Sequence, residues 1–60
     1  MWKKCYKLSI TYINGVTIFY DNMMYKKGLK CLKIRKLDEK KYYSISLENI
    51  EEIKCCDNVG

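Results

Sequence analysis

The chain has 60 residues, of which 48% are hydrophobic and 13% aromatic, and it carries a net charge of +5. This length limits it to one small domain, residues 1–60, which buries only roughly 60% of the surface of its unfolded chain. The hydrophobic content argues against a disordered tail. The charge favours acidic partners, such as nucleic acid or an acidic protein surface. The chain shows neither a secretory leader nor an apolar stretch near the roughly 18 residues of a membrane helix, so we expect a cytoplasmic protein without a membrane partner.

Residues 6–20 alternate between apolar and polar types on both sides of Asn14-Gly15, which predicts a β-hairpin. A two-residue loop would place the apolar residues of the two strands on opposite faces. A three-residue loop pairs Ile10 with Ile18 and places them on one face, so we favour it, with Gly15 left-handed. The expected inward set is Leu8, Ile10, Tyr12, Val16, Ile18 and Tyr20. Before the hairpin, Trp2 is expected to cover one end of the core.

Residues 29–37 and 42–47 predict a third and a fourth strand, joined by a charged turn at Asp38-Glu39. A two-residue loop at this turn brings the apolar residues of both strands onto one face, so that register and pattern agree. The expected inward pairs are Leu32 with Ile45 and Ile34 with Tyr43.

Residues 47–56 fit two interpretations. Leu47, Ile50 and Ile53 have helical spacing and Ser46 is a suitable N-cap, which would give a four-stranded meander with a C-terminal helix. We favour one tight turn followed by a last strand. The fold is then all-β, a five-stranded antiparallel SH3-like or Sm-like barrel with a short 3₁₀ turn before the last strand. The expected centre of its core is Ile10, Ile18, Leu32, Ile34, Tyr43, Ile45 and Ile53.

Two short pieces of the chain resemble the Sm-like RNA-chaperone family, namely Ile13-Asn14-Gly15-Val16 and Leu47-Glu48-Asn49-Ile50. The resemblance implies a small barrel. That family's RNA-contacting Tyr-Lys-His run has no counterpart, because the chain contains no His. No functional residue therefore carries over. In size and composition the chain is also similar to accessory proteins of phages and mobile elements.

Catalytic and metal-binding patterns are absent from the sequence. The serines have no base beside them, and no glycine-rich phosphate loop occurs. We therefore expect that the protein is not an enzyme and that it binds neither a cofactor nor a small-molecule substrate. No C-x-x-C spacing supports a zinc site, and without a secretory leader we expect four free thiols. The cysteines are Cys5, Cys31, Cys55 and Cys56.

Lys33, Arg35 and Tyr42 form the first candidate site, because the expected register places them on the outward face of the third and fourth strands. Two cations beside an aromatic ring can hold a phosphate backbone while a base stacks. These residues are therefore candidates for binding nucleic acid. The competing interpretation is a solvated strand face whose lysines prevent edge pairing.

Met23, Met24 and Tyr25 form the second candidate site, at a loop tip or on a bulged extension of the second strand. Methionine and aromatic residues are enriched at protein interfaces. The competing interpretation is that Met24 or Tyr25 folds back over the barrel.

Together these features predict a non-enzymatic binding protein. A protein partner or a second copy is expected first, nucleic acid second, and a purely structural subunit third. An accessory protein of a phage would act in the cytoplasm of its host, where some such proteins inhibit a defence or nuclease complex.

Overall fold

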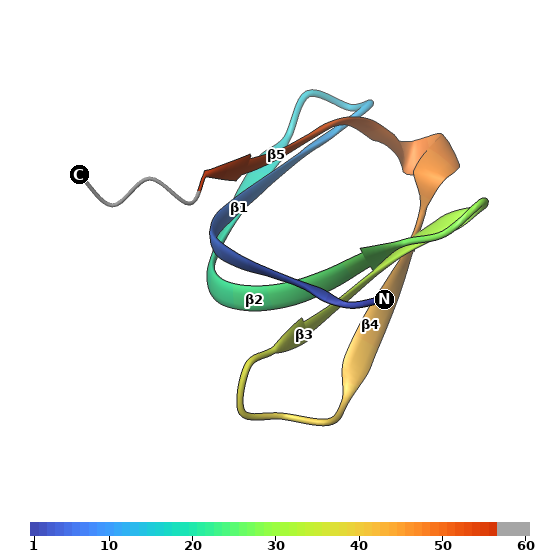
Figure 1. Cartoon of the computed structure of the whole chain (residues 1–60). Coiled ribbons are helices and arrows are strands. Elements are labelled where there is room, and N and C mark those ends of the chain that lie inside the picture. The colour runs from blue at the N-terminus through green and yellow to red at the C-terminus, as the bar shows by residue number, and fades with distance from the viewer. Residues whose placement is uncertain (57–60) are drawn as a thin grey trace.

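The computed structural model describes residues 1–56, which form one antiparallel sheet of five strands (Figure 1). The sheet order is β4-β3-β2-β1-β5, and a single 3₁₀ turn, η1, separates the last two strands. The elements are β1 (Lys3–Tyr12), β2 (Thr17–Lys27), β3 (Cys31–Lys36), β4 (Tyr42–Ser46), η1 (Leu47–Asn49) and β5 (Ile50–Cys56). The prediction of five strands with a turn before the last is confirmed, and the alternative C-terminal helix is wrong. In the described residues no ladder joins β4 to β5, so the sheet is not closed into a barrel.

The first hairpin has the three-residue-loop register expected from the sequence. Ile10 pairs with Ile18, and the Tyr12 amide donates to the Val16 carbonyl at 2.8 Å. Gly15 has φ +90°, a conformation that favours glycine, and its amide donates to the Tyr12 carbonyl at 2.9 Å. This confirms the argument that the buried face selects the register.

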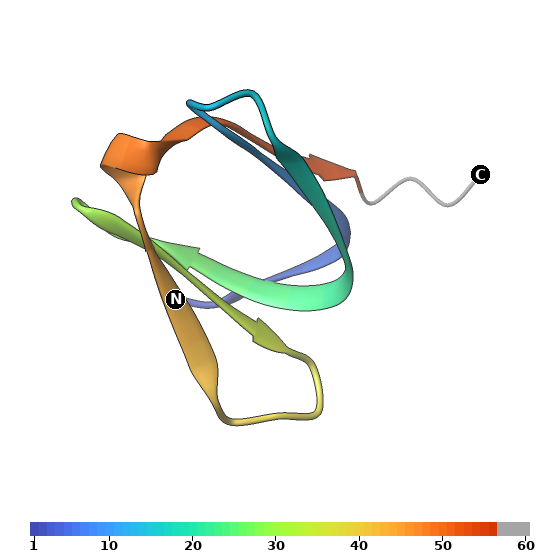
Figure 2. The same ribbon diagram turned by 180° about the vertical axis from the view of Figure 1, so that it is seen from behind.

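β1 and β2 bend together and change the face that they turn toward the core. Cys5 and Leu8 are both fully buried although they lie three residues apart, and Tyr20 and Met23 repeat this spacing in β2. Residues three apart in a regular strand point to opposite faces. One residue between the two members of each pair must therefore depart from the regular strand conformation. In β2 this residue is Asn22, which has φ 53°. The bend folds the sheet over on itself, as the view from behind also shows (Figure 2).

The bend divides the sheet into two halves. One half holds β5 and the parts of β1 and β2 nearest the first hairpin turn. The other half holds the remaining parts of β1 and β2, together with β3 and β4. β3 joins β2 only from Met23 to Lys27, so residues 17–21 of β2 have a neighbour on one side alone. β3 and β4 pair as predicted from the sequence, with Leu32 opposite Ile45.

The core lies between the two halves, and its buried residues are Cys5, Leu8, Ile10, Met23, Leu32 and Ile34. Ile45 and Ile53, which were expected at its centre, pack against it and are only partly buried. The prediction is wrong for Ile18, which is 40% exposed, and for Tyr43, which is 66% exposed. Ile18 belongs to the part of β2 that β3 does not cover, and Tyr43 belongs to the edge strand β4. Both point toward the core side without being covered.

A disulfide between Cys5 and Cys55 joins β1 to β5, with 5.8 Å between the Cα atoms. The expectation of four free thiols is therefore wrong. It rested on sequence context, whereas the β1–β5 ladder pairs Leu8 with Cys55 and brings this cysteine to the bend of β1. Cys31 has a free, half-buried thiol.

Candidate nucleic-acid interface

Lys33, Arg35 and Tyr42 lie together on the outer face of the sheet. Leu32 and Ile34 are buried, so the residues that alternate with them on β3 point away from the core. Tyr42 is directly opposite Arg35 across the β3–β4 ladder, and its side chain is half exposed. The ammonium of Lys33 lies 5.2 Å from the centroid of the Tyr42 ring. The structure thus brings the three predicted residues into one cluster.

Trp2 completes this cluster, although the sequence did not predict it as a member. Its ring centroid lies 6.1 Å from that of Tyr42, with 60° between the two planes. The guanidinium carbon of Arg35 lies 5.1 Å from the centre of the Trp2 ring. Each aromatic ring therefore has a cation of its own within cation–π distance. Trp2 does not cover the core as expected, because its ring packs beside Tyr42 and Arg35 instead.

Two further lysines extend the cluster across the sheet. Lys4 pairs with Met24, which in turn pairs with Arg35, and Lys26 pairs with Lys33. The outward strand positions around the cluster carry four cations and no carboxylate. We name this surface the basic-aromatic face, and it consists of Trp2, Lys4, Lys26, Lys33, Arg35 and Tyr42.

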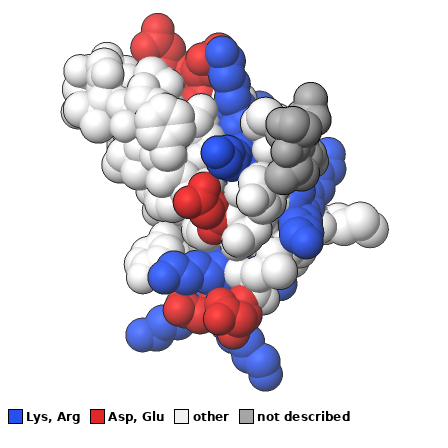
Figure 3. Space-filling model, turned by 90° about the vertical axis from the view of Figure 1, so that its left-hand side faces the viewer, with Lys and Arg blue, Asp and Glu red and all other residues white. Residues whose placement is uncertain are grey.

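Within the described residues, no ion pair involves a cation of the basic-aromatic face. Over residues 1–56 the ion pair found is Lys54 with Glu52 on β5, at 3.9 Å, far along the sheet order from β3. Arg35 instead donates to two backbone carbonyls, of Lys36 at 3.3 Å and of Glu39 at 3.1 Å. A shallow depression of about 570 Å³ beside Trp2 and Tyr42 continues the face toward the β3–β4 turn, where Asp38 and Glu39 also line it. On the side of the molecule that lies to the left in Figure 1, by contrast, acidic side chains lie between the basic ones (Figure 3).

The second predicted site does not form a surface of its own. Met23, Met24 and Tyr25 lie within β2, so the expected loop tip is wrong and the extension of the second strand is correct. Met23 is only 5% exposed and belongs to the core, and Tyr25 packs against the core. Met24 points the other way and pairs with Arg35. Strand alternation therefore places Met24 on the opposite face from Met23 and Tyr25.

An apolar groove of about 610 Å³ opens where β3 leaves β2. Phe19, 77% exposed, stands at its margin. Burial, followed by the charge of Tyr12 and a hydrogen bond with its side chain, raises the pKa of Tyr20 above its ordinary value. No sequence pattern predicts this groove, because the groove depends on where β3 separates from β2. Its lining residues are Tyr12, Phe19, Tyr20, Asp21, Met23, Ile34, Lys36, Tyr43, Ser44 and Ile45.

Other classes of site find little support in the described chain. Within residues 1–56, no group of His, Cys, Asp or Glu side chains is arranged to hold a metal ion. The same residues include no helix with the length and apolar character to cross a membrane. No protein-family model, curated protein or solved structure matches the chain. Functional inference therefore rests on the geometry of the surface.

Proposed function

We propose that the protein binds nucleic acid through the basic-aromatic face, without catalysing a reaction. The observation that carries this proposal is the pairing of two aromatic rings, Trp2 and Tyr42, each with a cation about 5 Å away. Aromatic rings beside basic side chains are the usual means by which proteins hold bases and phosphates together.

Two features of the face support this proposal over a merely solvated strand. The first is that no ion pair neutralises Lys33 or Arg35 within the described residues, so both charges are available to phosphates. The second is the number of rings: one aromatic was expected from the sequence, whereas stacking surfaces generally use several, and Trp2 supplies the second. Binding of this kind weakens steeply as salt rises, because phosphate contacts release counterions.

Charge reversal tests the proposal. The double substitution Lys33→Glu with Arg35→Glu should abolish binding to a fluorescent oligonucleotide in an anisotropy titration at low salt. In the parent, the logarithm of the binding constant should fall with the logarithm of salt concentration, by about 0.7 for each phosphate contacted on a single strand. Both side chains lie on the outer face, so circular dichroism of the variant should match that of the parent.

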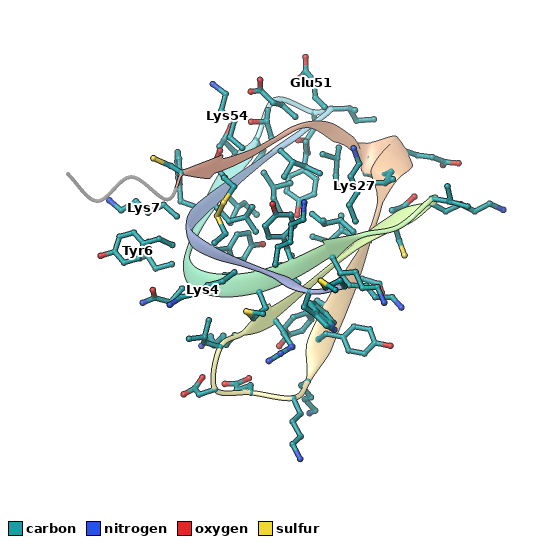
Figure 4. All side chains as sticks on the ribbon, viewed as in Figure 1. Lys4, Tyr6, Lys7, Lys27, Glu51 and Lys54 are labelled. Atoms are coloured by element: carbon teal, nitrogen blue, oxygen red, sulfur yellow. A yellow bond between two sulfur atoms is a disulfide. The ribbon has the colours of Figure 1, made fainter. Side chains whose placement is uncertain are left out.

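A matched control separates the face from net charge. Lys7→Glu with Lys54→Glu also lowers the net charge from +5 by four units, but near the bend of β1 and on β5 (Figure 4). This control should retain most of the binding. Equal loss in both double variants would show that only total charge matters and would contradict the assigned face.

The apolar groove supports a second candidate function, which is contact with a protein partner. Phe19 and Tyr43 are large, exposed rings that both line this groove, and buried aromatic anchors dominate many interfaces. In this role the chain would act as an accessory protein that blocks a nuclease or defence complex. Phe19→Ser with Tyr43→Ser should then abolish a complex that survives nuclease treatment, while the Lys33 and Arg35 reversal should not.

We also propose that the fold has a small SH3-like or Sm-like architecture. The strand order β4-β3-β2-β1-β5, the shared bend of β1 and β2 and the 3₁₀ turn before β5 support it. In such an arrangement the outer face of β2–β4 is free to bind a strand of nucleic acid while the opposite face holds the core.

A further inference from the structure

We infer that the ligand of the basic-aromatic face is an unpaired strand of nucleic acid, whose successive bases are separated and stack one on Trp2 and the other on Tyr42. This inference rests on the proposed function and specifies its substrate class. It follows from the spacing of the two rings, the spacing of the two cations and the way in which each cation is held.

The two rings are too far apart and too steeply inclined to continue a regular base stack. Successive bases in a stacked strand rise by about 3.4 Å, whereas the ring centroids of Trp2 and Tyr42 are 6.1 Å apart and their planes differ by 60°. Two bases that stack on these rings must therefore part from one another. A base in a duplex would also have to unpair from its partner, which costs free energy. An unpaired strand avoids that cost.

The two cations repeat the spacing of the rings. Lys33 and Arg35 are two residues apart on β3, which corresponds to about 6.6 Å along a strand. Each lies beside a different ring, Lys33 beside Tyr42 and Arg35 beside Trp2. The face thus presents two ring-and-cation units at nearly equal intervals, one for each of two successive nucleotides.

The two cations differ in how they are held. Arg35 is fixed by its donation to the carbonyls of Lys36 and Glu39, so it remains beside Trp2 when a ligand arrives. In the described residues Lys33 has no such hydrogen bond, and its ammonium covers the ring of Tyr42. A base that stacks on Tyr42 displaces this ammonium toward the phosphate. Lys33→Gln should therefore reduce the salt slope by about 0.7, the loss of one phosphate contact.

Trp2 provides a direct readout, because it is the only tryptophan in the chain. Its intrinsic fluorescence should fall in a saturable manner when a single strand of about 12 nucleotides, a length within the usual site sizes, is added. Four probes of equal length distinguish the sources of binding: single-stranded DNA, single-stranded RNA, the DNA duplex, and an abasic strand that keeps the phosphates. The two single strands should bind at least about tenfold more tightly than the duplex or the abasic strand.

Neighbouring tyrosines supply the matched variants. Tyr42→Ala should weaken binding of the single strand by about tenfold, equivalent to about 1.4 kcal/mol. Tyr43→Ala removes a more exposed ring, 66% against 51%, on the groove side of β4, and should leave affinity for the single strand unchanged. Thermal melts of both variants establish that each is folded.

Three results would overturn the inference. Equal binding of all four probes without a change in tryptophan fluorescence would leave nucleic-acid binding in place but remove base stacking. Equal effects of the Tyr42 and Tyr43 substitutions would remove Tyr42 from the site. Absence of binding to every probe at low salt would overturn the proposed function itself.

Discussion

β1 and β4 have similar alternating sequences but play different parts in the molecule. β1 contains three residues with no exposed surface, Cys5, Leu8 and Ile10, whereas no residue of β4 is fully buried. The cause is position in the sheet. β1 lies between β2 and β5, while β4 pairs with β3 alone.

The comparison separates stability from recognition. The centre of the sheet, around β1, holds the buried apolar area and the disulfide. The edge, around β4, leaves rings uncovered on both of its sides: Tyr42 on the basic-aromatic face and Tyr43 at the apolar groove. Substitutions at the centre should therefore change the free energy of unfolding. Substitutions at the edge should change binding.

Loss of the disulfide should have the largest effect on stability. Cys5 and Cys55 are 50 residues apart, and closing a loop of this size stabilises the folded chain by about 4 kcal/mol in the chain-entropy model. Cys5→Ala with Cys55→Ala should lower the free energy of unfolding in urea by roughly this amount. The free energy of unfolding of a domain is about 5–15 kcal/mol in total, so this loss should leave a measurable fraction of the molecules unfolded.

Reductant provides the control for this prediction. It should destabilise the parent and leave the double variant unchanged, while Cys31→Ala should keep the parent's response. Alkylation of four thiols in unreduced parent protein would contradict the disulfide and remove the link between β1 and β5.

The pair Ile10 and Ile18 tests the same comparison with a single residue type. They face each other across the β1–β2 ladder, but Ile10 is fully buried and Ile18 is 40% exposed. Ile10→Ala should cost about 3 kcal/mol and Ile18→Ala about 1 kcal/mol or less, because an uncovered site leaves no cavity. Urea unfolding of both variants measures the difference. Equal losses would mean that residues 17–21 of β2 are covered in solution, as by a second copy of the chain.

Local pattern was enough to predict the two hairpins and their registers, although it did not predict that β1 begins at Lys3 or that β2 continues to Lys27. Alternation on both sides of Asn14-Gly15 correctly placed Ile10 opposite Ile18, and the same reasoning placed Arg35 opposite Tyr42. A register error of one residue would turn every side chain to the wrong face. The predicted members of the basic-aromatic face therefore came from sequence alone.

Features that depend on neighbours distant in sequence were not predicted. The position of Trp2 requires the order of four strands, and the disulfide requires β1 and β5 to be adjacent. Met23 is buried because β2 changes the face that it turns toward the core at Asn22. The positive φ of Asn22 is not predicted by any sequence pattern. The groove requires β3 to leave β2 part-way along its length.

Tyr20 gives the smallest expected effect, at the boundary between the covered centre and the open edge. Its pKa is raised above 10.0, chiefly by burial and then by Tyr12. Because the folded-state pKa is the higher one, the protonated phenol stabilises the fold fully below pH 10. This contribution is lost as pH rises through the folded-state value. Stability of the parent should therefore fall more steeply above pH 10 than that of Tyr20→Phe, in urea unfolding at a series of alkaline pH values. Tyrosinate absorbance should lose a late-titrating component in the variant. A variant with the same alkaline slope and the same titration curve would place Tyr20 in solvent and would mean that the groove is open to water down to its floor.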